Sequence, residues 1–165
     1  MNMKFIVFSD SHGDMAAMSA ALRKHRSCDV VLFCGDGCND LAKLRMDNPD
    51  KAFFAVSGNC DWYCSEPNFQ VLELAGKKIF MTHGHMFGVK QSTERLISVG
   101  RQNGCNIVLF GHTHKQLTTV ESGMLVLNPG SVGYGGCYSI IEIDEKTGKI
   151  KATEYPNDDY GPVII

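Results

Sequence analysis

The sequence lacks any uninterrupted hydrophobic run of the roughly 20 residues that a membrane-spanning helix needs. The short apolar stretch near the N-terminus is broken by Asp10, and no small-residue cleavage site follows it, so we expect no signal peptide. We therefore expect a soluble, cytoplasmic protein that does not associate with membranes. Repeats, low-complexity tracts and linkers are also missing, and 165 residues suit one domain spanning 1–165.

A large excess of charge of either sign is also lacking. The formal net charge is −2, whereas a protein that coats nucleic acid usually carries a clear positive excess. We therefore expect no stable nucleic-acid binding, although a local basic patch is compatible with this net charge. The overall composition, 44% hydrophobic and 21% charged, is that of an ordinary globular protein.

The cysteines do not form the even, regularly spaced set that is typical of a disulfide framework. There are seven of them: Cys28, Cys34, Cys38, Cys60, Cys64, Cys105 and Cys137. We expect reduced thiols that act as small buried hydrophobic groups. The alternative is a structural zinc site, because Cys34 and Cys38 are separated by three residues, as are Cys60 and Cys64.

Short apolar runs alternate with amphipathic stretches along the chain. We expect helices over 14–26, 39–46 (capped by Asn39 or Asp40) and 93–101. We expect strands over 4–8, 30–33, 52–56, 69–74, 78–81, 107–110, 118–120, 125–127, 138–143 and 150–154. Early βαβ units followed by later hairpins favour an α/β fold in which two sheets pack face to face with helices outside.

Polar residues that can bind metal follow one expected strand after another. They are Asp10 and His12, then Asp36, then Asn59, then His83 and His85, and finally His112 and His114. Because the carboxyl ends of strands gather at one edge of an α/β sheet, five distant loops would bring these side chains together. Taken singly, the aspartates could be helix caps or turn residues and Asn59 a turn residue.

The chemistry of this ligand set is coherent. Imidazole together with carboxylate suits Mn, Fe, Co, Ni or Zn better than Ca or Mg. The spacing of one residue in Asp10–His12 and His112–His114 places each pair on one face of an extended backbone. Seven ligands exceed what one tetrahedral ion takes but suit two ions that share a carboxylate. A metal pair about 3.5–4 Å apart is the arrangement used in two-metal hydrolysis of phosphate esters.

Six short motifs carry a family resemblance: FSDSHG at 8–13, CGDG at 34–37, SGNCD at 57–61, MTHGH at 81–85, FGHTH at 110–114 and NPGSVG at 128–133. In this order they are specific, and they cover the chain from its first strand nearly to its end. The sequence resembles the calcineurin-like metallophosphoesterases. Within them, it is similar to the small bacterial and archaeal phosphodiesterases related to the vacuolar-sorting subunit of retromer.

The resemblance implies a four-layer α/β/β/α sandwich and two divalent metal ions. Asp10, His12 and His114 would bind the first ion, Asn59, His83 and His112 the second, and Asp36 would bridge them. A bridging water or hydroxide would be the nucleophile, and Asp36, Asn59 and His85 are the expected catalytic residues. Mn²⁺ is the expected metal, with Ni²⁺, Co²⁺, Fe²⁺ and Zn²⁺ as alternatives. A homodimer or homotetramer agrees with the resemblance.

These inferences predict a phosphodiesterase for a small-molecule or nucleotide-like substrate. The alternative is a metal-binding scaffold like the retromer subunit, but all seven ligand positions hold good ligands, which favours the enzyme. Many family members have a His after the metal-binding Asn, and that His protonates the leaving group. Cys60 stands there instead, as in the small subfamily. His85 and Asp61 are the nearby alternatives, and we expect a preference for good leaving groups.

Four further residues have ordinary or functional interpretations. His25 is expected to be a solvated residue at a helix end. Ser131 either faces a phosphate or belongs only to a turn. Trp62 and Tyr63 either line the mouth of the site or form a subunit contact.

Overall fold

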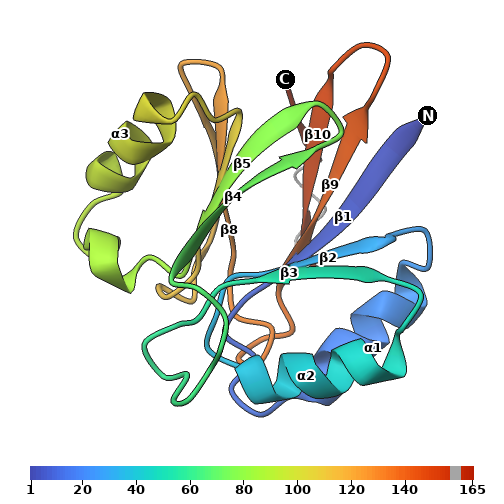
Figure 1. Ribbon diagram of the computed structural model, residues 1–165. Helices are drawn as coiled ribbons and strands as arrows, with labels where there is room; N and C mark the ends of the chain where they lie inside the picture. Colours follow the sequence, from blue (N-terminus) through green and yellow to red (C-terminus); the bar gives the residue numbers. More distant parts are fainter. Residues whose placement is uncertain (157–160) are drawn as a thin grey trace.

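The computed structural model describes residues 1–156 and 161–165. Two mixed sheets pack face to face, and helices cover their outer faces, as Figure 1 shows. The six-stranded sheet has the order β11-β10-β9-β1-β2-β3, and the five-stranded sheet has the order β4-β5-β6-β8-β7. The expected α/β sandwich of two packed mixed sheets flanked by helices is thereby confirmed.

The first sheet consists of β1 (Asn2–Phe8), β2 (Val30–Phe33), β3 (Ala52–Ala55), β9 (Tyr138–Asp144), β10 (Ile150–Tyr155) and β11 (Val163–Ile164). β1 pairs in parallel with β2 and antiparallel with β9. Its outer face is covered by α1 (Met15–Lys24) and α2 (Cys38–Asp47). The second sheet consists of β4 (Phe69–Leu74), β5 (Lys77–Thr82), β6 (Ile107–Leu109), β7 (Gln116–Glu121) and β8 (Met124–Pro129). The 3₁₀ turn η1 (His85–Phe87) and α3 (Glu94–Gln102) lie on its outer side.

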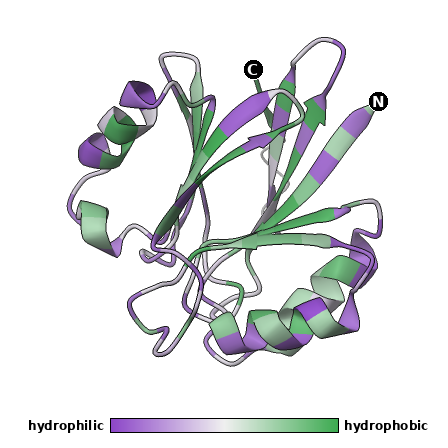
Figure 2. Cartoon of the chain, viewed as in Figure 1, coloured by the Kyte–Doolittle hydropathy of each residue, from purple (hydrophilic) through white to green (hydrophobic). Residues whose placement is uncertain are grey.

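Burial on both faces explains why β2, β6 and the second half of β1 are apolar throughout. In β1, Phe5 and Val7 point into the core between the two sheets, and Ile6 and Phe8 point into the core under α1 and α2. Neighbouring side chains of a strand point to opposite faces, so a strand that is covered twice needs apolar residues at every position. Figure 2 shows these strands as mostly hydrophobic and the helices as alternating between hydrophobic and hydrophilic residues.

The strand ends meet where the ligand loops were expected. Gly111, after β6, donates its N–H to the His83 carbonyl oxygen after β5 at 2.9 Å. Asp10, after β1, donates its N–H to the Gly35 carbonyl oxygen after β2 at 2.8 Å. His83 Nδ1 also donates to the carbonyl oxygen of Cys34, after β2, at 2.7 Å, so the strand ends of both sheets form one edge of the sandwich. No helix within the described residues is long and apolar enough to cross a membrane.

Two local expectations are wrong. Helix α2 begins at Cys38 with Gly37 as its N-cap, and Asp40 accepts hydrogen bonds from Ser11 Oγ and the Gly13 N–H instead of capping the helix. His25 is half-buried, because its Nε2 lies 2.8 Å from the Tyr138 hydroxyl. The imidazole is therefore part of the packing between α1 and β9 and not a solvated group.

Gly100 generates a stability prediction, because α3 packs on the second sheet at this residue. A Cβ added there would lie 2.5 Å from Val108 Cγ2 and 3.1 Å from Met124 Sδ. Gly100→Ala gains about 1 kcal/mol of helix propensity but meets a stiff, buried valine, and overpacking costs about 1–3 kcal/mol. We expect a net loss in the free energy of unfolding, measured by urea denaturation. The control, Ser98→Ala on the exposed face of α3, is expected to be neutral or stabilising. An equal gain in both variants would refute the packing account.

Candidate metal centre

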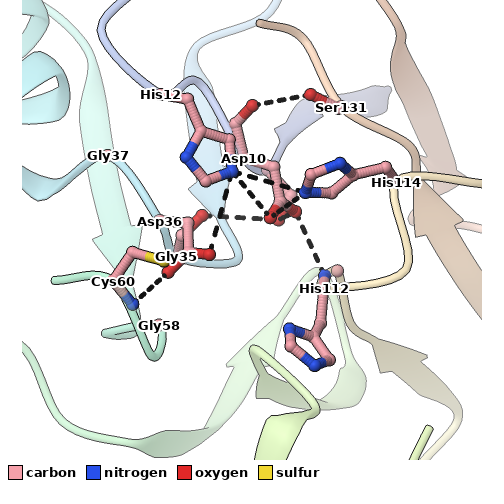
Figure 3. A network of polar contacts seen from close by, with 12 residues as sticks. Asp10, His12, Gly35, Asp36, Gly37, Gly58, Cys60, His112, His114 and Ser131 are labelled. Carbon is pink, nitrogen blue, oxygen red and sulfur yellow. Dashed lines mark hydrogen bonds and ion pairs between the residues drawn. The ribbon is translucent and has the colours of Figure 1, made fainter. Parts of the chain in front are cut away.

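Two clusters of carboxylate and imidazole groups lie side by side at the shared edge. Asp10, His12 and His114 offer ligand atoms that all lie within 4.8 Å of one another, and Asp36, His83 and His112 do the same. In the first triad, His114 Nε2 is 3.1 Å from Asp10 Oδ1 and 3.3 Å from His12 Nε2 (Figure 3). The structure therefore brings together six of the seven predicted ligands, in the two groups that the resemblance implies.

Asp36 lies between the two triads. Its Oδ2 atom is 3.2 Å from His83 Nε2 and 3.8 Å from His12 Nε2. On the other side, Asp10 Oδ1 is 3.9 Å from His83 Nε2. A carboxylate that bridges two cations needs this kind of intermediate position.

Each carboxylate is held by one oxygen and turns the other toward the imidazoles. Asp10 Oδ2 accepts hydrogen bonds from Ser9 Oγ at 2.5 Å and the His112 N–H at 3.1 Å. Asp36 Oδ1 accepts a hydrogen bond from the Cys60 N–H at 2.8 Å, as Figure 3 shows. Burial raises the pKa of Asp36, but contact with His83 and the Cys60 N–H outweigh it, so the pKa lies below its ordinary value.

His83 provides the test of whether a cation fits. Its Nδ1 atom donates to the Cys34 carbonyl oxygen at 2.7 Å, which turns Nε2 toward Asp36. Nε2 is buried and makes no hydrogen bond with the described part of the chain. In a neutral ring, Nε2 would aim a lone pair at a carboxylate, which is repulsive unless a proton or a metal ion lies between them. Burial lowers the pKa of His83, but the carboxylates of Asp36 and Asp10 outweigh it and raise the pKa. The residues therefore fit a bound cation.

His112 and His85 flank His83 on the second triad. The ring centroid of His83 is 5.0 Å from that of His112 and 5.5 Å from that of His85. Burial, followed by the positive charge of His83, lowers the pKa of both residues, and Lys90 lowers the pKa of His112 further. A neutral imidazole is the form that binds metal. His85 Nδ1 is buried without a hydrogen-bond partner among the described residues.

Asn59 is the predicted ligand that stands apart. Its side chain is exposed, and its Nδ2 atom is 3.5 Å from Cys60 Sγ. No hydrogen bond within the described residues joins the amide to either triad, so its role as a ligand stays a prediction. The neighbouring residue Cys60 is also exposed, and partial loss of solvent around its sulfur, together with the negative charge of Asp36, raises the pKa of the thiol.

The ligand residues also share an unusual backbone. Asp10, His12, Asp36, His112 and His114 all have positive φ, between 43° and 70°. Asp and His adopt this left-handed conformation more often than most residues, but it remains uncommon. Each ligand therefore sits on a sharp turn just past its strand, which aims the side chain back over the edge of the sheets.

Asp61 organises the loops around Asp36, and sequence reasoning missed this role. Its Oδ2 atom accepts from the Asp36 N–H at 2.7 Å and the Gly58 N–H at 2.8 Å. Its Oδ1 atom accepts from the Gly37 N–H at 2.8 Å and the Cys38 N–H at 2.9 Å. The carboxylate thus caps the start of α2 and ties the loop after β2 to the loop after β3, so it has no free lone pair to exchange protons with a substrate. The expectation that Asp61 could serve as a general acid is wrong.

Cys38 and Cys64 also contradict an expectation. They form a disulfide with their Cα atoms 6.2 Å apart, so these two cysteines are not reduced thiols. Cys28, Cys34 and Cys105 are free and buried, as expected for small hydrophobic groups. The zinc site considered from the cysteine spacing is not formed, because Cys38 and Cys64 are bonded to each other.

Ser131 and Tyr134 hold the rim of the first triad. Ser131 Oγ is buried, donates to the Asp10 carbonyl oxygen at 2.8 Å and accepts from the Tyr134 N–H at 2.9 Å. It is therefore a turn residue and does not face a phosphate. The Tyr134 ring stacks on His12 with centroids 5.1 Å apart. Trp62 and Tyr63 are exposed on the loop that follows Asn59.

A sandwich of two mixed sheets with paired carboxylate and imidazole clusters at one edge defines the metallophosphoesterase class of proteins. Residues 3–146 match the calcineurin-like phosphoesterase superfamily domain, and the chain belongs to this family. It is 30% identical to the probable metallophosphoesterase YsnB of Bacillus subtilis over 132 residues, covering 79% of this chain and 75% of that protein. It is 28% identical to the phosphodiesterase MJ0936 of Methanocaldococcus jannaschii over 144 residues, covering 78% and 83% of the two chains.

Solved structures agree with the fold. A predicted phosphoesterase from Streptococcus pneumoniae superposes with a TM-score of 0.78 at 30% identity, covering 100% of this chain and 98% of that one. Vacuolar Protein Sorting 29 from Cryptosporidium parvum superposes with a TM-score of 0.77 at 20% identity, covering 99% and 96% of the two chains. The family assignment and the resemblance inferred from the motifs are therefore confirmed.

Asp61 generates a prediction that can be tested without metal. Asp61→Asn places an NH₂ group against backbone N–H donors and leaves at least one of them unpaired. We expect the free energy of unfolding of metal-free protein to fall by about 2–3 kcal/mol in urea denaturation. The control is Asp14→Asn, because Asp14 caps α1 by accepting from a single N–H, that of Ala17. Asn caps helices about as well as Asp, so this change should cost less than about 0.5 kcal/mol. Similar losses in both variants would contradict the role given to Asp61.

Proposed function

We propose that the protein is a phosphodiesterase that holds two divalent transition-metal ions, with Mn²⁺ as the first candidate. Asp10, His12 and His114 would hold one ion, and His83 and His112, joined by Asn59, would hold the other. Asp36 would be shared between the two sites. The observation that supports this proposal best is the position of Asp36 Oδ2 between His83 Nε2 and His12 Nε2, at 3.2 and 3.8 Å.

The bound ions supply a water nucleophile that ionises near neutral pH and positive charge that offsets the charge developing on the phosphate. The protein's own residues fix where this chemistry takes place. Ser9 and the Cys60 N–H fix the orientations of Asp10 and Asp36, and the Cys34 carbonyl fixes the tautomer of His83. Because these ligands are held before any ion arrives, little reorganisation is needed when the site fills.

Local charge favours a diester over a monoester. Two divalent ions together with Asp10 and Asp36 leave about +2, which falls to about +1 once the nucleophile is ionised. A phosphodiester carries one negative charge and matches this value, whereas a monoester dianion exceeds it.

A scaffold function is the second candidate. The observations that favour it are the fold shared with Vacuolar Protein Sorting 29 and two exposed aromatic residues, Trp62 and Tyr63. An interaction module has no need of a complete ligand set, however, and both triads are complete in this chain. Completeness of the site therefore favours the enzyme.

The first functional prediction concerns metal content and hydrolysis. Purified protein should bind two Mn²⁺ ions per chain by isothermal titration calorimetry and elemental analysis. Asp36→Asn should weaken both sites, His114→Ala mainly the first and His112→Ala mainly the second, while His25→Gln, outside both triads, should keep two ions.

Hydrolysis of bis(p-nitrophenyl) phosphate should stop with chelator, return with Mn²⁺, and exceed that of p-nitrophenyl phosphate in kcat/KM. Full hydrolysis after exhaustive chelation would exclude the metal mechanism, and two tightly held ions in Asp36→Asn would exclude the bridge.

The supply of a proton to the leaving group is the weak point of this site. Burial and His83 lower the pKa of His85, so this imidazole is mostly neutral at pH 7. Cys60 has a raised pKa and is a poor acid, and Asp61 is engaged with the backbone. The enzyme should therefore favour substrates whose leaving groups depart without a proton.

Cys60 generates a prediction about leaving groups. Across a series of aryl and alkyl diesters, kcat/KM should fall steeply as the pKa of the leaving group rises. Cys60→His should flatten this dependence and accelerate the poorest leaving groups most, because a general acid contributes about 10²–10⁴-fold. Cys60→Ser is the matched control and should change little. A large loss in Cys60→Ser with both ions still bound would mean that the thiol takes part in the reaction.

A further inference from the structure

A cavity of about 500 Å³ opens next to the second triad, between the segment that joins η1 to α3 and the start of β7. Apolar side chains of Val89, Phe110 and Leu117 line part of it. A Cβ added to Gly84, between His83 and His85, would lie 2.8 Å from Val89 Cγ2. The loop that carries these two histidines therefore packs directly against the cavity wall.

The polar part of the lining is positively charged. Lys90 and Lys115 both line the cavity, and no acidic residue does. Neither ammonium group forms an ion pair with the described residues, although the chain as a whole has a net charge of −2. On a protein with a net negative charge, lysines have acidic neighbours with which they can pair. Two lysines that remain unpaired around one cavity therefore form a site of positive potential.

Thr93 also lines this cavity and brings the start of α3 to it. It is the N-cap of α3, and its side chain makes no capping hydrogen bond. The N-terminus of a helix carries partial positive charge, which favours anions, and here, within the described residues, only the Glu94 N–H is already engaged, by Ser92 Oγ at 3.1 Å. The acidic residue of the first turn, Glu94, is not part of the lining.

The cavity and the candidate metal centre share a wall. Thr113 lines the cavity, and its two neighbours in the chain are His112 and His114. Asn128 Nδ2 donates to the Thr113 hydroxyl at 3.0 Å, so this wall is fixed. Thr113, with Lys115 two residues further on, therefore joins the candidate metal centre to the lysine-lined cavity.

We propose that this cavity, defined by Lys90, Thr93 and Lys115 around an apolar wall, is a substrate subsite for a second anionic group. The substrate is then a diester whose organic arm carries a phosphate or carboxylate, with its carbon skeleton against Val89, Phe110 and Leu117. This proposal rests on the proposed function, because it assigns the subsite to the substrate of the same metal centre.

The test compares diesters with one leaving group, p-nitrophenolate. Thymidine 5′-(p-nitrophenyl phosphate) is the parent, and its 3′-phosphate and 3′-hemisuccinate derivatives carry the second anion. For Mn²⁺-loaded protein, we expect kcat/KM for at least one derivative to exceed that of the parent by about 3–10-fold, as one or two lysine contacts allow. Lys90→Gln and Lys115→Gln should remove this gain, measured in each variant as the ratio of derivative to parent kcat/KM. The control is Lys146→Gln, in the turn between β9 and β10, and it should keep the gain. The derivative that shows the gain in kcat/KM identifies whether the subsite binds phosphate or carboxylate.

A second measurement does not depend on activity. Inorganic phosphate or acetate is titrated into Zn²⁺-loaded protein, and amide shifts are followed by ¹H–¹⁵N correlation NMR. We expect shifts at Lys90, Thr93 and Lys115 that disappear in the two lysine variants. If neither anion moves these amides and neither derivative outperforms the parent, while bis(p-nitrophenyl) phosphate is still hydrolysed, the subsite is wrong and the proposed function stands. If no diester is hydrolysed, the proposed function fails, and lysine-dependent shifts alone would then support an anion site.

Discussion

The two oxygens of each buried carboxylate have different roles, and the arrangement of the rest of this site depends on that difference. Asp10 and Asp36 are almost completely inaccessible to solvent, and a buried charge is stable only when it is paired and hydrogen-bonded. One oxygen of each group is engaged by Ser9 or by the Cys60 N–H, and the other lies among imidazoles. The histidines are therefore both the electrostatic partners that make burial tolerable and the groups that fit a cation.

The loops that present these ligands depend in turn on two further carboxylates. Asp61 gathers N–H groups from the loops of Asp36 and Gly58 and from the start of α2. Asp40 joins α2 to the β1 loop through Ser11 Oγ and the Gly13 N–H. The Cys38–Cys64 disulfide lies beside Asp61, so the segment after Asn59 is anchored at both ends. The fixed orientation of Asp36 is thus a property of three loops and not of one strand end.

The sequence predicts the parts of this arrangement that repeat. Apolar strands ending in Asp or His are visible as a pattern, and they indicated the sandwich and the convergence of Asp10, Asp36 and His83 correctly. The role of Asp61 could not be read in the same way, because its partners are backbone N–H groups whose directions depend on the folded turns at Gly37 and Gly58. The pairing of Cys38 with Cys64 spans 26 residues and has no periodic signal. The expectation that His25 is solvated was wrong for a similar reason, because its partner Tyr138 comes from the far end of the chain.

The left-handed backbone conformation of the ligand residues serves the metal centre but lowers the stability of the fold. A non-glycine residue held in such a conformation costs about 1–3 kcal/mol, and Asp10, His12, Asp36, His112 and His114 all adopt it. Glycine would relieve that strain at His12, His112 or His114, whose side chains do not hold the surrounding loops, and would abolish a ligand at the same time. A library of variants selected only for heat resistance would therefore accumulate changes in the metal centre, and gains in stability would mark the residues that the activity requires.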